Sequence, residues 1–348
     1  MEGINMRRKT VSILIALLLT AVSLNSNAES IQVDQILSCE NATLHISAEV
    51  ELPLAEKLPV LVAEENRFDV DQILQSFFSD VNEPVTIRAS GDGGTYIMCA
   101  DGSEFDLGDG VFWYMGVHYL QHYRESEFYV KTPEKEIIGF PVEDAQAIAG
   151  EWMRALGFQE FELLFTLPMS LESFKKWKLE GQPEPTEQNE GYFFRYCISH
   201  HGTLCMPLPR FSKYYGDVVR GAGLEIFISR SGIQYFSTDA GCTTYRVISE
   251  QKRDERIATL DEAIEVMKER YDQLIIPDTV EINRIRFYYT IKPVIGKGVQ
   301  TYELWPAWVF YSIPYVDELD PYVNKLDPYA NVIDPLLIVN AITREIME

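Results

Sequence analysis

The chain has few basic residues and, beyond its first 24 residues, no long apolar run. Its 348 residues include 30 Lys and Arg against 53 Asp and Glu, which gives a formal net charge of −23 at pH 7. A surface this acidic repels nucleic acid and anionic membranes, so neither is expected as a partner. The acids are spread along the chain, which is also typical of a surface that keeps a protein soluble.

Cysteine and catalytic motifs are scarce as well. The five cysteines are an odd number, which excludes a complete set of intrachain disulfides. No Gly-x-Ser-x-Gly elbow, phosphate-binding loop or dinucleotide fingerprint occurs in the sequence. We therefore assign no catalytic, cofactor-binding or metal-binding residue and expect no cofactor. The hydrophobic content of 46% excludes a globally disordered chain.

The beginning of the chain has the pattern of a signal peptide. Three basic residues, Arg7 to Lys9, precede an apolar run from Val11 to Leu24 that is shorter than the roughly 20 residues of a membrane span. Ser26 and Ala28 supply the small side chains that a signal peptidase recognises. We predict a signal peptide over residues 1–28 and a secreted, extracytoplasmic protein, with an uncleaved N-terminal anchor as the alternative. No integral membrane span is expected after its removal.

A lipid anchor is not favoured by the same region. The segment Ile36-Leu37-Ser38-Cys39 faintly resembles a lipobox, but the mostly polar residues 25–35 separate it from the apolar run. A lipobox cysteine must follow the apolar run directly, so release is preferred to lipid tethering.

Three stretches share the pattern of a helix that begins with acids. An apolar residue, a turn and then acids recur at residues 68–74, 140–146 and 257–263, where acids favour the positive end of the helix dipole. The third stretch has a capping box formed by Thr259 and Glu262. The second helix is expected to end at Gly157. Their apolar stripes are typical of helices that bury one face in a core.

Strand-like segments with alternating apolar residues follow each predicted helix. We therefore predict an α+β fold of three helix-on-antiparallel-sheet modules in tandem. The predicted boundaries are 1–28 for the signal peptide, 29–135 for the N-terminal module, 136–250 for the middle module and 251–348 for the C-terminal module. The polar, proline-bearing stretch 180–189 is predicted to be an exposed insertion in the middle module.

The third module resembles a known family. Asp261-Glu262-Ala263, Phe287-Tyr288-Tyr289, Leu304-Trp305-Pro306-Ala307-Trp308 and Val339-Asn340-Ala341 resemble the pattern of PepSY-like families of exported Gram-positive proteins. The whole chain looks like an uncharacterised family of exported Firmicutes proteins built in this way. The same pattern is similar to extracytoplasmic accessory proteins that restrain a cell-wall-sensing histidine kinase. The resemblance implies PepSY-like folding and a regulatory role, but no catalytic residue, because its motif residues are structural.

The sharpest local cluster is Cys197-Ile-Ser-His200-His201-Gly-Thr-Leu-Cys205. With a turn at His200 to Gly202, the two cysteines are expected opposite each other on a hairpin. Two thiolates and two imidazoles can hold zinc, and the same geometry suits a cross-strand disulfide. Buried, free thiols with an exposed histidine pair are the third interpretation.

Other candidates are weaker. His118 and His122 are four residues apart but lack the glutamate of a metalloprotease motif. The repeated Asp-Pro pairs at 320, 327 and 334 offer oxygen ligands for calcium, although a loop of successive turns is the default. Trp305 is expected to be exposed and Trp308 to lie in the core, so exposed aromatics can bind carbohydrate.

These features predict an exported, non-catalytic interaction or regulatory protein that binds a protein partner at the cell envelope. Two alternatives stay open. One is a metal-binding protein or metal-dependent enzyme that uses the Cys197–Cys205 hairpin, and the other is a carbohydrate-binding module.

Overall fold

The protein is mostly β-sheet. The computed structural model describes residues 30–40, 42–69, 71, 73, 84–89, 94–108, 110–116, 136–158, 160–177, 184–207, 210–212, 217–219, 221–238, 242–251, 255–274, 279–294, 301–312 and 336–347. Within them, strands far outnumber the three short α-helices. The predicted α+β fold of three helix-on-sheet modules is therefore wrong. The predicted signal peptide, residues 1–28, lies outside the described residues.

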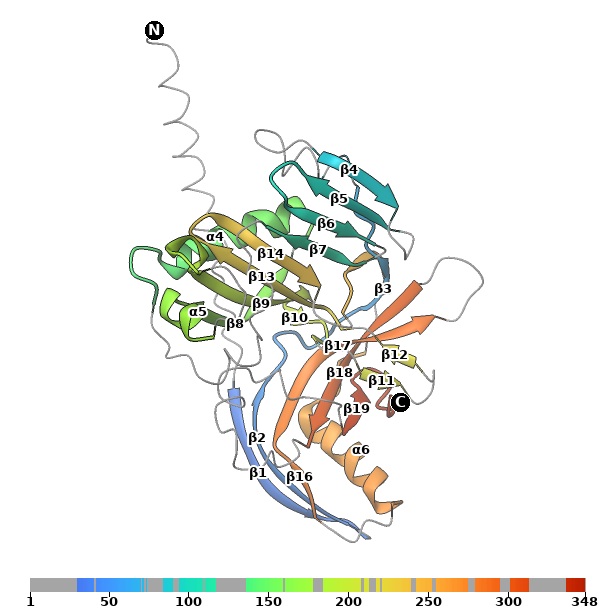
Figure 1. Ribbon diagram of the computed structural model, residues 1–348. Helices are drawn as coiled ribbons and strands as arrows, with labels where there is room; N and C mark the ends of the chain where they lie inside the picture. Colours follow the sequence, from blue (N-terminus) through green and yellow to red (C-terminus); the bar gives the residue numbers. More distant parts are fainter. Residues whose placement is uncertain are drawn as a thin grey trace, which may run out of the picture.

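A nine-stranded sheet forms the upper half of the molecule in Figure 1. Its order is β10-β9-β13-β14-β7-β6-β5-β4, and β8 pairs with β9. The strands are β4 (Pro84–Ala89), β5 (Thr95–Cys99), β6 (Glu104–Leu107), β7 (Phe112–Met115), β8 (Phe161–Met169), β9 (Gly191–His200), β10 (Thr203–Leu204), β13 (Gly223–Ser229) and β14 (Gly232–Thr238).

Two smaller sheets lie below it. The five-stranded sheet has the order β15-β3-β18-β17, with β19 also paired to β18, and the three-stranded sheet has the order β1-β2-β16. A two-stranded ribbon pairs β11 (Arg210–Ser212) with β12 (Asp217–Val219). The sheet strands are β1 (Ser30–Ser38), β2 (Thr43–Glu51), β3 (Val60–Glu65), β15 (Tyr245–Gln251), β16 (Thr279–Ile282), β17 (Arg284–Val294), β18 (Thr301–Tyr311) and β19 (Leu337–Asn340).

The tandem arrangement fails because distant parts of the chain share sheets. The parallel partner of β2 is β16, and β3 lies between β15 and β18. The early strand β7 pairs with β14, which joins β4–β7 to the sheet of the middle region. Alternating apolar residues specify which face of a strand is buried but not which strand lies beside it. The sequence pattern could therefore locate many strands without giving their partners.

Helices cover only small parts of the sheets. Helix α4 (Val142–Ala155) contacts β9, β13 and β14, and the short α5 (Leu171–Trp177) contacts the 3₁₀ turn η1 (Glu187–Asn189). Helix α6 (Leu260–Asp272) contacts β19 and begins with the predicted capping box of Thr259 and Glu262. Gly157 follows α4 with a φ of +91°, as expected of a residue that ends a helix. Of the first predicted helix, Asp71 and Ile73 are helical, and most of its other residues lie outside the described ones.

One continuous hydrophobic core joins the three main sheets. It includes Leu44 and Ile46 of β2, Phe194 of β9 and Trp308 of β18, each at most 1% exposed. The predicted core position of Trp308 is confirmed. Because a single core runs through all three main sheets, their mutual arrangement is fixed by packing, and segments from different sheets meet at defined places.

Candidate functional site: a cleft where the sheets meet

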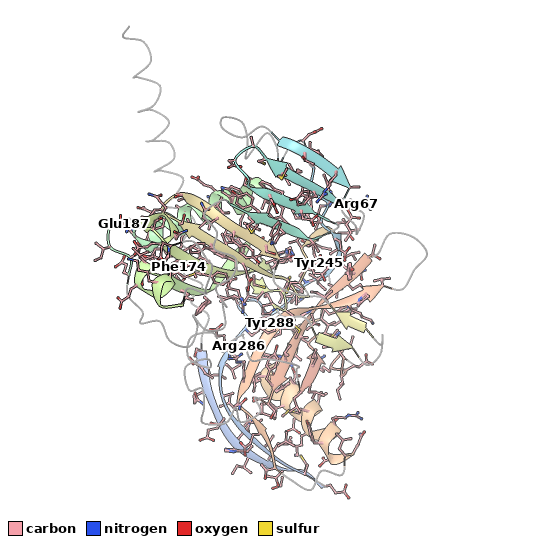
Figure 2. All side chains as sticks on the ribbon, viewed as in Figure 1. Arg67, Phe174, Glu187, Tyr245, Arg286 and Tyr288 are labelled. Atoms are coloured by element: carbon pink, nitrogen blue, oxygen red, sulfur yellow. The ribbon has the colours of Figure 1, made fainter. Side chains whose placement is uncertain are left out.

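A small cleft opens where three sheets approach one another. It has a volume of about 70 Å³ and is lined by the end of β2 with the residues that follow it, by β8, by the β9–β10 hairpin and by β17. Figure 2 labels Arg286 and Tyr288 of its wall near the middle of the molecule. Because four segments from distant parts of the chain form the cleft, its shape depends on the complete fold.

The β9–β10 hairpin reaches the cleft through a tight turn. His200 pairs with Thr203, so His201 and Gly202 form a two-residue loop, and both have positive φ angles of 52° and 69°. Such a loop favours glycine at its second position. A Cβ atom at Gly202 would lie 3.6 Å from Leu54 Cδ1, so the turn packs directly against the apolar wall of the cleft. Leu54 itself is 56% exposed.

Two carboxylates, those of Glu51 and Glu162, line the cleft. Burial raises the pKa of Glu162, and the negative charges of Glu51 and Glu160 raise it further. Arg286, also in the wall, donates from Nη1 to the backbone oxygens of Glu49 and Ile285, both at 2.9 Å. Its guanidinium is thus partly occupied by the backbone. The cleft presents acids between apolar groups that include Leu54, Phe287 and Tyr288.

Replacing Glu162 with glutamine is expected to raise the melting temperature at pH 7. The folded state holds the Glu162 proton more tightly than the unfolded state, so stability falls as the pH rises through the window between the two pKa values. The gain should shrink as the pH is lowered to about 4.3, the usual pKa of a glutamate, and below it, because Glu162 then becomes protonated in both the folded and the unfolded state and is neutral like the glutamine. Thermal melts from pH 4 to 8 measure this difference, and a gain that does not depend on pH would contradict it.

The Cys197–Cys205 hairpin differs from its predicted geometry. The two-residue loop shifts the register, so Cys205 N–H donates to Ile198 O at 2.8 Å and the two cysteines do not face each other. The Cys197 thiol instead donates to the backbone oxygen of Cys205 at 3.0 Å. None of the five cysteines, all of which lie in the described part of the chain, forms a disulfide. The prediction assumed a three-residue turn at 200–202, and one residue fewer in the turn moves each partner by one position.

Neither thiol has the lowered pKa of a reactive cysteine. Cys197 and Cys205 are fully buried, and burial is the main cause that raises the pKa of each, so both keep their protons. Burial lowers the pKa of His200, while His201 Nε2 lies 3.0 Å from Glu250 Oε1. Among the residues described, no group of three or more His, Cys, Asp or Glu is placed to hold a metal ion.

The remaining candidates are dispersed. His118, His122 and the Asp-Pro pairs at 320, 327 and 334 lie outside the described residues. Trp305, which was expected to be exposed, is partly buried, and its Nε1 donates to Glu303 Oε2 at 2.9 Å.

Sequence reasoning missed Glu51, Glu162 and Arg286 as members of one site. Each lies in a strand of ordinary composition, and no motif or spacing connects them. Only the pairing of distant strands brings them together. The one local feature of the sequence that points to the site is the His201-Gly202 pair. It predicts a tight turn but does not indicate which residues pack against that turn.

Comparison with known proteins supports the fold and nothing more specific. No protein family profile and no curated protein matches the chain. The structure is similar to the crystal structure of an uncharacterized protein from Eubacterium rectale ATCC 33656, with a TM-score of 0.59 and 14% sequence identity. The match covers 93% of this chain and 97% of the other. None of the helices in the described part is long and apolar enough to cross a membrane.

Proposed function

We propose that the chain is an exported, non-catalytic protein that binds a protein partner at the cell envelope, and that the cleft receives a basic side chain of that partner. The observation that carries the proposal is a cleft of about 70 Å³ in which the carboxylates of Glu51 and Glu162 lie beside apolar groups, while the guanidinium of Arg286 in the same wall donates to backbone oxygens. Sites for whole small molecules are typically about 300–1,000 Å³. A volume this small fits one side chain that belongs to a larger ligand.

The chemistry of the lining selects a lysine or arginine. The alkyl stem of such a side chain packs on apolar groups such as Leu54, while its cationic end approaches Glu51 and Glu162. Burial is the main cause that raises the pKa of Glu162 and the negative charges of Glu51 and Glu160 add to it, so an incoming positive charge offsets this repulsion. The net charge of −23 attracts a basic partner before contact. Export rests on the predicted signal peptide over residues 1–28.

Site-specific photocrosslinking tests this function. A photoreactive amino acid at Leu54 should capture one envelope protein in the producing cells, and Glu162→Arg should reduce the captured amount at least tenfold by repelling the basic side chain. The matched control carries the same photoreactive group at Ile87, which is 53% exposed on β4 at the far end of the nine-stranded sheet. Equal capture from both positions would contradict the proposal.

A catalytic role for the cleft predicts a different result. A glutamate with a raised pKa is also what a general acid requires. If the purified protein hydrolyses a glycan or peptide and Glu162→Gln abolishes the turnover, the non-catalytic proposal is wrong.

A further inference from the structure

Within the described part of the structure, strand β1 is an edge strand of its sheet. It pairs with β2 along all nine residues, Ser30 to Ser38, without a register shift. Among the described residues it has no other strand partner. Its side chains alternate between exposed and half-buried along its whole length, and the exposed Ile36 retains 69% of its surface. An open edge presents backbone donors and acceptors to any strand that approaches it.

The other edges in the described part of the structure carry features that hinder pairing. Strands β4, β8 and β15 contain irregular register, and β4 and β8 also contain a proline. Strand β17 includes Lys292 and Pro293, while β10, β11, β12, β16 and β19 are at most four residues long. Bulges, prolines, lysines and short lengths are the usual protections of sheet edges. Strand β1 has none of them, and its one charged residue is Asp34.

The turn between β1 and β2 shows which backbone groups of β1 point away from β2. Cys39 N–H donates to Ala42 O at 2.9 Å, which continues the β1–β2 ladder by one pair. Peptide groups alternate in direction along an antiparallel strand, so those of odd-numbered residues point to β2. The N–H and C=O groups of the even-numbered residues, including Gln32, Asp34 and Ile36, therefore point outwards.

Charge on the exposed face of this sheet indicates the chemistry of the partner. Asp34 is 74% exposed, and Glu281 of β16 is 56% exposed on the same face. His45 lies between them, with Nδ1 2.8 Å from Glu281 and Nε2 3.7 Å from Asp34. Glu49 of β2 adds a third carboxylate and accepts a hydrogen bond from Ser30. An added strand with lysines at alternate positions would place its cations within a Debye length of these acids.

We infer that β1 binds an extended, lysine-bearing segment of a protein partner by strand addition. Main-chain hydrogen bonds to the open edge give affinity, and the acids of the exposed face select the charge. A second copy of this chain is a poor occupant, because both copies carry −23 and a pairing centred on the strand would oppose Asp34 to Asp34. The inference extends the proposed function to a second surface and does not require the cleft.

A synthetic peptide tests this binding mode. The probe has seven residues in which lysine alternates with threonine and valine, and the control has glutamate in place of lysine. Fluorescence anisotropy should show binding of the lysine peptide only, and hydrogen exchange should slow within residues 30–38. Ile36→Pro removes one outward N–H without changing the charge, and edge strands tolerate such prolines. We expect it to weaken binding at least tenfold, whereas Ile36→Thr should bind as the wild type does.

Further results separate this inference from its alternatives. Asp34→Lys should also weaken the lysine peptide at least tenfold, which keeps the test valid if Ile36→Pro melts early. Glu162→Arg, which tests the cleft, should leave the peptide affinity unchanged. Equal binding to Ile36→Pro, or slowed exchange at residues 51–54 instead of 30–38, would overturn the inference. A dimer that forms in the wild type and is lost in Ile36→Pro would also overturn it, because a second copy would then occupy the edge.

Discussion

Replacing Arg195 with methionine is expected to lower the free energy of unfolding by about 3–5 kcal/mol, because it removes the ion pair that Arg195 forms with the buried carboxylate of Glu225. Arg195 Nη2 lies 2.6 Å from Glu225 Oε1, between neighbouring strands β9 and β13. The two side chains are only 9% and 8% exposed. Without the guanidinium, the Glu225 carboxylate would stay in a poorly solvated place. Chemical denaturation followed by circular dichroism measures the loss.

A second substitution separates the cost of leaving a charge buried from the cost of losing side-chain packing. The double variant Arg195→Met and Glu225→Leu removes both charges, and buried ion pairs replaced by apolar groups often cost little. We expect it to recover most of the lost stability. Arg246→Met is the matched control, since Arg246 pairs with Glu64 but is 63% exposed. It should change stability by roughly 0–1 kcal/mol. A double variant as unstable as Arg195→Met would show that the charge is not the cause.

Local structure in this protein could be predicted from the sequence where one residue type decides it. Thr259 and Glu262 begin α6 as predicted, because a capping box satisfies backbone donors that only a helix start leaves free. Alternation located β17, whose residues Ile285 and Phe287 are buried while Arg284 and Arg286 are partly exposed. Strand β1 was missed, although Ile31, Val33 and Leu37 alternate with exposed residues in the same way. The polar Gln35 takes the half-buried position between Val33 and Leu37, so the alternation of apolar and polar residues is interrupted.

Long-range pairing could not be predicted in the same way. Nothing near Val60 indicates that β3 would lie between β15 and β18, and nothing near Thr279 indicates a parallel pairing with β2. These pairings depend on the packing of all three main sheets around one core. The cleft shares this dependence, because Glu51 and Glu162 meet only after both sheets have formed. The predicted domain boundaries and the resemblance to an exported protein family stay predictions, whereas the PepSY-like module fold that the resemblance implied is wrong, because the described structure is mostly β-sheet.

Replacing Trp308 with alanine is expected to destabilise the fold by about 3–5 kcal/mol, the usual range for a buried tryptophan. Trp308 is 1% exposed in the middle of β18, and its ring packs edge-on against Phe287 at 4.9 Å between ring centroids. Its Nε1 donates to Ala258 O at 2.8 Å, just before α6 begins. The side chain therefore fills the core and also fixes the start of the helix to the sheet.

Two further variants separate these roles of Trp308. Trp308→Phe retains most of the ring but leaves the buried Ala258 oxygen without this donor, which should cost about 1–3 kcal/mol. Hydrogen exchange in Trp308→Phe should accelerate first at residues 258–264, because the helix start loses its tie. Trp305→Ala, three residues away on the same strand, removes a partly buried ring and should have the smallest effect of the three. Equal destabilisation by Trp305→Ala and Trp308→Ala would contradict this prediction. It would mean that the Trp-Pro-Ala-Trp segment stabilises the strand as a unit, and that the hydrogen bond from Trp308 to the start of α6 adds nothing specific.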